Sequence, residues 1–87
     1  MARRSSAEIR AEYQRLHDKV WFNRHYARPL PENPHWQKGE EYAQALRDRY
    51  GEEFLDPGDD FAWGETMGKF QALAWALGVD WEAAGDT

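Results

Sequence analysis

Three histidines, His17, His25 and His35, are the residues of this sequence best suited to proton transfer near neutral pH. Acid–base catalysis or a histidine metal site would need such residues at a fixed spacing from one another. The chain has no His-x3-His pair and no HExxH sequence, and His17 and His25 share a helix face only loosely. Cysteine is absent, which removes thiolate catalysis and disulfides. We therefore expect no enzymatic activity, no catalytic residue, no metal and no cofactor.

The other chemically suggestive residues are better explained as structural ones. Asp59 and Asp60 stand directly before an apolar run, where a carboxylate is typical of a helix N-cap and favours the positive end of the helix dipole. The glycines occur within a predicted helix or at turns, and none lies in a phosphate-binding loop between a strand and a helix. The sequence therefore implies no small-molecule ligand.

Length and composition predict a single small domain. The chain has 87 residues, of which 41% are hydrophobic and 15% aromatic, a composition that excludes a simple disordered tail. It contains no run of about 18 apolar residues that could cross a membrane. The charged N-terminus lacks the apolar stretch of a signal peptide, so we expect a cytoplasmic protein. We expect one helical domain over residues 1–87, with residues 1–4 flexible and an acidic tail over residues 82–87.

Two breaks divide the chain into three helical segments. The first break, residues 28–34, contains three prolines, which forbid helix in the residues before them. The second, residues 51–60, contains the turn sequence Asp56-Pro57-Gly58. Nothing alternates with period two for long enough to indicate a strand. The predicted fold is all-α, a bundle of three helices over residues of about 5–27, 34–50 and 60–77, with the last helix at its centre.

Capping signals and apolar spacing support these segments. Ser5 and Glu8 form a capping box, Asn33 with Pro34 is a typical helix start, and Gly51 supplies a helix end. The first segment has apolar residues at helical spacing: Ile9, Tyr13, Leu16, Val20 and Ala27. The second has another such stripe: Trp36, Gly39, Ala43, Leu46 and Tyr50.

The last segment has two apolar faces instead of one. The predicted core face consists of Trp63, Met67, Phe70, Ala74 and Leu77. The second face, centred roughly 140° away, consists of Phe61, Gly64, Gly68, Ala72 and Trp75. Gly78 closes the helix, and we expect Trp81 beyond it to fold back onto the core.

The glycines of the second face call for a compensating contact. Each glycine inside a helix costs roughly 0.5–1 kcal/mol relative to alanine. Gly64 and Gly68 would permit the close approach of another backbone, which compensates that cost. Two alternatives remain: another helix of the same chain fills this groove, or another chain does. We take Phe61, Gly64, Gly68, Ala72 and Trp75 as the candidate interaction residues.

Charge is distributed unevenly and suggests a second class of function. Residues 1–28 carry a net charge of +4 and residues 29–87 a net charge of −9. Five cationic and aromatic residues could contact a single-stranded nucleic acid: Lys19, Trp21, Arg24, Tyr26 and Arg28. Alternatively, the aromatic rings cover the other helices and the cations pair with the acidic part of the chain. The acidic part could instead occupy the basic groove of a nucleic-acid-handling protein as an inhibitor.

The C-terminal pattern resembles a known group of proteins. The run from Asp60 to Trp81 fits D-F-x-W-G-x-x-x-G-K-x-x-A-L-x-W-x-L-G-x-x-W and, with Trp21-Phe22-Asn23-Arg24-His25-Tyr26, is similar to small bacterial and phage-borne proteins without a known activity. The resemblance covers about a third of the chain and implies no reaction. It does imply that the two glycines act together with three tryptophans: Trp63, Trp75 and Trp81.

These observations predict a small non-enzymatic interaction module. We expect its partner to be a protein, either a second copy or a different chain, and its contact surface to be the Gly64/Gly68 face. A nucleic-acid-directed role through the basic aromatic first helix is the alternative. We expect no contact with a membrane.

Overall fold

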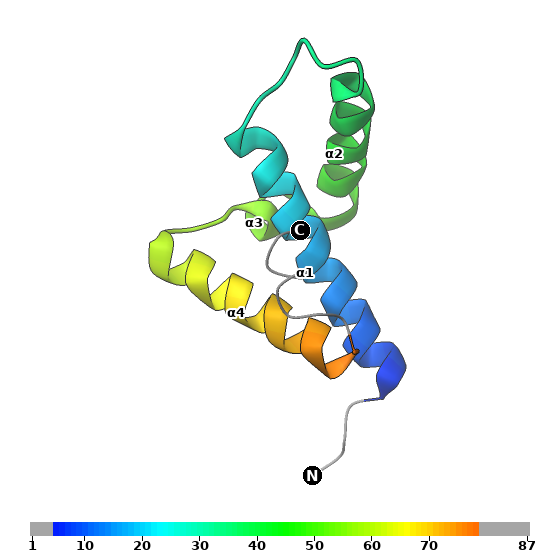
Figure 1. Ribbon diagram of the computed structural model, residues 1–87, viewed down its shortest axis with the longest axis vertical. Helices are drawn as coiled ribbons and strands as arrows, with labels where there is room; N and C mark the ends of the chain where they lie inside the picture. The colour runs from blue at the N-terminus through cyan, green and yellow to red at the C-terminus, as the bar shows by residue number, and fades with distance from the viewer. Residues whose placement is uncertain (1–4, 79–87) are drawn as a thin grey trace.

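A computed structural model of the protein describes residues 5–78, and every regular element in that range is a helix. The helices are α1 (Ser6–Ala27), α2 (Trp36–Tyr50), α3 (Glu52–Leu55) and α4 (Asp60–Ala76) (Figure 1). The predicted all-α fold is confirmed, and the three predicted helices correspond to α1, α2 and α4. The expectations for residues 1–4, for Trp81 and for the tail over residues 82–87 lie outside the described range.

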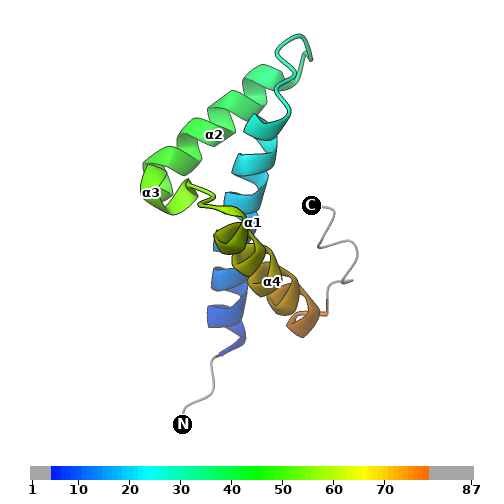
Figure 2. The same ribbon diagram turned by 90° about the vertical axis from the view of Figure 1, so that its left-hand side faces the viewer.

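The helix at the centre is α1. In Figures 1 and 2, α2 lies along the C-terminal half of α1, whereas α4 crosses its N-terminal half. The short α3 contacts both α1 and α2, and within residues 5–78 the backbone of α4 approaches no helix except α1. Our expectation that the last helix is central is therefore wrong. With 22 residues, α1 is roughly 33 Å long, enough to carry different neighbours on its two halves.

Three of the predicted helix ends have the expected chemistry. The Glu8 backbone N–H donates to Ser5 Oγ at 3.1 Å, and the Ser5 N–H donates to Glu8 Oε1 at 3.2 Å, which completes the capping box. Asp59 caps α4 by accepting from the Ala62 N–H at 2.8 Å. Gly78 has a φ of 84° and donates its N–H to the Trp75 carbonyl, as a C-terminal glycine does.

The start of α2 differs from the prediction. The helix begins at Trp36, two residues after the predicted position, and His35 occupies the N-cap without a side-chain bond. Asn33 Oδ1 instead accepts from the His35 N–H at 2.8 Å and stabilises the turn that precedes the helix. A short Asn side chain readily makes this local bond two residues ahead, which competes with a true N-cap.

The second predicted break contains a helix that the sequence analysis missed. Gly51, with a φ of 83°, separates α2 from the single turn of α3. Leu55 at the end of that turn is only 1% exposed. Four residues are too few to show helical periodicity, so nothing in the pattern distinguished α3 from a loop.

The main core lies between α1 and α4. Leu16 and Val20 of α1 pack with Phe70 and Ala74 of α4, and all four are buried. The Tyr13 ring stacks on Phe70 with centroids 5.1 Å apart. Several partly buried residues pack against this cluster: Phe54, Trp63, Met67 and Leu73.

The predicted core stripes hold with one exception. Phe70 and Ala74 of the predicted α4 core face are buried, and Leu77 is half-buried. On α2, Ala43 and Leu46 are buried as expected. Ala27, predicted to belong to the first stripe, is exposed because α1 extends past α4 at that end.

Replacing Leu55 by Ala should therefore destabilise the domain, although Leu55 lies outside the predicted helices. We expect a loss of about 2–5 kcal/mol in the free energy of unfolding, because a buried leucine is removed from a packed site. Leu30→Ala is the matched control, since Leu30 is 60% exposed and its loss should stay within about 0.5 kcal/mol. Urea unfolding followed by far-UV circular dichroism measures both, and equal losses would contradict the assigned packing of α3.

Candidate interaction surfaces

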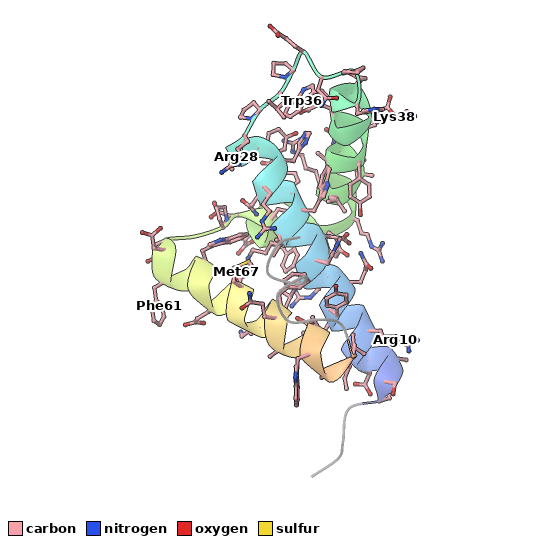
Figure 3. The ribbon with its side chains drawn as sticks, viewed as in Figure 1. Arg10, Arg28, Trp36, Lys38, Phe61 and Met67 are labelled. Carbon is pink, nitrogen blue, oxygen red and sulfur yellow. The ribbon has the colours of Figure 1, made fainter. Side chains whose placement is uncertain are left out.

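The outer face of α4, formed by Phe61, Gly64, Gly68, Ala72 and Trp75, points away from the rest of the described protein. All five residues are exposed, with Phe61 at 77% and Trp75 at 70%. Figure 3 shows Phe61 and Met67 on opposite sides of α4, with Met67 towards the core. Phe70, the central core residue of α4, is about 200° around the helix from Gly68. The α4 outer face is thus opposite the face that packs on α1.

Both glycines of this face are open. A Cβ atom added at Gly64 or at Gly68 would meet nothing within 4 Å among the described residues. No helix of residues 5–78 therefore fills the groove, which excludes the intramolecular alternative for that part of the chain. The cost of two glycines inside α4 has no compensating contact there.

The edge of the α4 outer face carries one acidic and one basic residue. Glu65 and Lys69 are exposed and lie four residues apart on the same side of α4. Within the described chain no ion pair joins them. Their charges remain close to any molecule that covers the adjoining apolar face.

The five candidate nucleic-acid residues are split between different environments. Trp21, Arg24 and Arg28 line an open cavity of about 400 Å³ near the C-terminus of α1, together with Trp36. The Lys19 ammonium instead lies 5.2 Å from the centre of the Phe54 ring. Burial, followed by repulsion from Arg15, lowers the pKa of Lys19.

Tyr26 faces α2 and not the cavity. Its hydroxyl donates to Glu40 Oε2 at 3.1 Å, and the Arg47 guanidinium lies 5.1 Å from the centre of its ring. The same Arg47 lies 5.1 Å from the Phe22 ring. These two rings therefore cover α2.

A stack of three rings joins α1 to α2. His25 lies between Trp21, at a centroid distance of 4.9 Å, and Trp36, at 4.0 Å. Its Nε2 atom lies 3.1 Å from Glu40 Oε1. The stack requires Gly39, because a Cβ atom there would lie 2.7 Å from His25 Cε1. The aromatic surface available for stacking on a base is therefore largely used within the protein.

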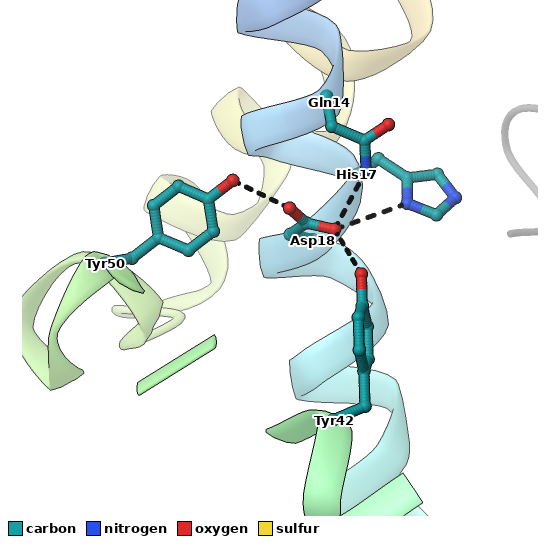
Figure 4. Close-up of polar contacts among 5 residues, drawn as sticks. All are labelled: Gln14, His17, Asp18, Tyr42 and Tyr50. Atoms are coloured by element: carbon teal, nitrogen blue, oxygen red, sulfur yellow. Dashed lines mark hydrogen bonds and ion pairs between the residues drawn. The ribbon is translucent and has the colours of Figure 1, made fainter. Parts of the chain in front are cut away.

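The buried carboxylate of Asp18 forms a second link between α1 and α2 (Figure 4). Asp18 is 1% exposed. Its Oδ1 accepts from Gln14 Nε2 at 3.0 Å and from the Tyr42 hydroxyl at 2.8 Å. Its Oδ2 accepts from the Tyr50 hydroxyl at 2.7 Å. Three donors and no acceptor match an ionised carboxylate, whose burial is tolerable only when its oxygens are hydrogen-bonded.

The tyrosines respond to this carboxylate. Burial and the hydrogen bond to Asp18 raise the pKa of Tyr42 to about 12, and the same causes raise the pKa of Tyr50. His17 Nδ1 lies 4.0 Å from Asp18 Oδ1, which is beyond hydrogen-bond distance, and this buried atom has no hydrogen-bond partner among residues 5–78. The His17 ring instead packs edge-on against Phe70, with centroids 5.9 Å apart.

Sequence reasoning missed the α2-facing side of α1, although a signal was present. Gln14, Asp18, Trp21 and His25 are spaced four, three and four residues apart, which is helical spacing. Because two of these residues are strongly polar, a search for apolar stripes passes over them. A polar residue in register with aromatic residues is the pattern that would have identified this face.

Substituting Tyr42 by Phe should change how stability depends on alkaline pH. A tyrosine with a raised pKa contributes stability that is present below its unfolded pKa, near 10, and is lost as pH rises towards about 12. The free energy of unfolding should therefore fall less steeply over that range in Tyr42→Phe, and least in Tyr42→Phe/Tyr50→Phe. At neutral pH, Tyr42→Phe should cost about 1.5 kcal/mol, since Asp18 loses a donor. Identical pH slopes in wild type and double variant would contradict this role.

Alanine substitutions at three glycines should change the stability of the monomer in different directions. Gly39→Ala should destabilise the protein, because the new methyl group clashes with the His25 ring. Gly64→Ala and Gly68→Ala should each stabilise the monomer by about 0.5–1 kcal/mol, because the methyl group meets open space and alanine favours helix. Thermal unfolding of the three variants at low protein concentration provides the comparison. A destabilised Gly68→Ala monomer would show that the groove is filled within the chain.

The described residues offer no metal site and no membrane-spanning helix, and comparisons with known proteins supply no relative from which a function could be transferred. Among residues 5–78, no group of three or more His, Asp or Glu side chains is placed to hold a metal ion. None of the helices described for that range combines the length and the hydropathy of a membrane-spanning segment. No protein-family model matches the chain, and no curated protein or solved structure shows significant similarity to it. The resemblance to bacterial and phage-borne proteins stays a prediction.

Proposed function

We propose that this chain is a non-enzymatic protein-interaction module that binds a helix of a partner through the α4 outer face. The observation that carries the proposal is the combination of two exposed aromatic side chains with two open glycines on one helix face. Phe61 and Trp75 stand at the two ends of this face, with the glycines between them. A partner helix would lie in the shallow middle and contact an aromatic ring at each end.

The energetics of α4 favour this function. Large exposed aromatic residues gain most when they are buried in an interface, and tryptophan is enriched among the residues that dominate binding energy. The glycines cost helix stability in the monomer, and a closely approaching backbone is the contact that compensates that cost. The exposed aromatic side chains and the open glycines would therefore gain stabilising contacts in a complex, whereas within residues 5–78 they have none that offset their cost.

A nucleic-acid-directed role is the second candidate, and one observation favours it. Trp21, Arg24 and Arg28 meet at one cavity, so two cations and an aromatic ring could contact a phosphate and a base. Lys19 and Tyr26 do not join them. With a net charge of −9 over residues 29–87, most of the chain would repel a phosphate backbone. The alternative in which the acidic part inhibits a nucleic-acid-handling protein rests on that charge alone.

Variants of the α4 outer face should lose association and keep their fold. Gly68→Leu fills the groove, and Trp75→Ser removes an aromatic anchor. We expect each to weaken protein binding at least tenfold while the monomer stays folded in thermal unfolding, with Gly68→Leu at least as stable as wild type because leucine favours helix over glycine. Binding is measured by sedimentation for self-association and by photo-crosslinking from position 61 for other proteins, with a crosslinker at exposed Gln44 of α2 as the control.

Ionic strength separates the two candidate functions. Association through an apolar face should persist from about 0.05 M to about 1 M NaCl, whereas phosphate contacts should weaken steeply. If a labelled single-stranded oligonucleotide binds at low salt and Arg24→Ala/Arg28→Ala abolishes that binding, the nucleic-acid function is correct. Equal crosslinking from positions 61 and 44 would count against the α4 outer face as a binding surface.

A further inference from the structure

The α4 outer face has an internal symmetry that points to a particular partner. Gly68 is the middle residue of α4, which runs from Asp60 to Ala76. Gly64 and Ala72 lie four residues before and after it, and Phe61 and Trp75 lie seven residues before and after it. The face therefore reads the same in both directions along the helix in terms of residue size: large, small, small, small, large.

Such a face is complementary to itself. A two-fold axis perpendicular to α4 at Gly68 would reverse a second α4 and set each residue against the one at the mirrored position. Phe61 of one copy would then meet Trp75 of the other, and Gly64 would oppose Ala72. We propose that a second copy of this chain occupies the α4 outer face, so that two α4 helices pack antiparallel across Gly68. This inference rests on the proposed function and names the partner.

The aromatic residues fit side by side in this arrangement. Consider a line drawn along the surface of α4 through Gly68, parallel to the helix axis. At about 100° per residue, Phe61 lies roughly 20° around the helix to one side of this line, and Trp75 lies roughly 20° to the other side. The two-fold axis preserves these sides, so the two rings lie next to each other and do not collide. Aromatic pairs favour such offset contacts. The small residues in the middle let the two backbones approach each other.

The charges at the edge of the face favour the antiparallel orientation. Glu65 and Lys69 lie on the same side of the line through Gly68, three residues before it and one residue after it. The antiparallel axis keeps that edge in common, so Glu65 of one copy lies only two residues, roughly 3 Å, along the axis from Lys69 of the other. This attraction forms twice, whereas the two Lys69 residues approach each other once at the same separation along the axis, so the opposite-charge contacts outnumber the like-charge one. In a parallel dimer these edges would lie on opposite sides of the interface, and the pair could not form.

Within residues 5–78, the rest of the chain leaves room for this contact. The core residues Phe70 and Ala74, which pack on Leu16 and Val20 of α1, lie on the opposite side of α4. A 17-residue helix is roughly 25 Å long, so the contact is at the small end of specific interfaces. We therefore expect a dimer that dissociates on dilution.

Disulfide trapping tests the orientation directly, because the chain has no cysteine of its own. Gly68→Cys alone should form a linked dimer, since the axis passes through that position. An equimolar mixture of Gly64→Cys and Ala72→Cys should give mainly the mixed dimer, at least fivefold over either variant alone. In a dimer of either variant alone, the two cysteines would lie eight residues apart, roughly 12 Å along the helix axis. That distance is too long for a disulfide. Gln44→Cys, exposed on α2, is the control for random collision.

A charge exchange provides a second, independent measurement. Glu65→Lys places like charges together twice and should weaken the dimer roughly threefold to tenfold in sedimentation equilibrium. Lys69→Glu should do the same. Glu65→Lys/Lys69→Glu restores opposite charges and should return the dissociation constant to within about twofold of wild type. Both residues are exposed, so the fold of each monomer serves as an internal control by circular dichroism.

Three results would overturn the inference. One is efficient self-linking of Gly64→Cys and of Ala72→Cys without preference in the mixture, which indicates a parallel pair. Another is a dimer whose dissociation constant does not respond to Trp75→Ser. The third is a monomer at every concentration. If the protein is monomeric but position 61 still crosslinks to a different protein above the Gln44 control, the proposed function stands and only the second copy is rejected.

Discussion

The structure depends on the burial of one helix from two directions. Within residues 5–78, α1 supplies the contact surface for every other helix, and α2 and α4 lie against different halves of it. Because the backbone of α4 approaches only α1 among the described helices, one side of α4 is sufficient for the core formed with Leu16 and Val20. The opposite side, which is also apolar, has no neighbour at its two glycines in the described chain. The exposed outer face is thus a consequence of a central α1, and in a bundle centred on α4 it would be covered.

The two sides of α1 use different interactions. Towards α4, apolar side chains pack around Phe70, where size and shape decide the fit. Towards α2, Asp18 accepts three hydrogen bonds, two of them from Tyr42 and Tyr50, which lie eight residues apart on α2. A buried carboxylate tolerates few alternative arrangements, because any register that loses a donor leaves a charge unsatisfied. Apolar packing alone would define the position of α2 less sharply. The ring stack over Gly39 adds a second constraint on the same pair of helices.

Local signals predicted what local physics controls. The capping box at Ser5, the N-cap at Asp59 and the glycine at position 78 each depend on a few neighbouring residues, and each has the expected bonds. Periodicity predicted the core face of α4 for the same reason. It missed α3, which is a single turn, and it missed Asp18, because a charged residue in a core is recognised only by its partners on α2. The candidate residues of the α4 outer face came from the sequence, whereas the separation of Lys19 and Tyr26 from the other cationic residues did not.

The amino-acid sequence by itself determined that the protein is helical, where its three long helices lie within about two residues, and that the last one has two apolar faces. These properties follow from spacing along one chain segment, which the order of residues contains completely. Only the tertiary structure decided which helix is central, where Asp18 finds its donors, and which face of α4 stays open. Those outcomes depend on the choice of neighbours among segments far apart in the chain. Which segments pack together depends on the free energy gained by burying two surfaces against each other, so it cannot be evaluated from the residues of one segment alone.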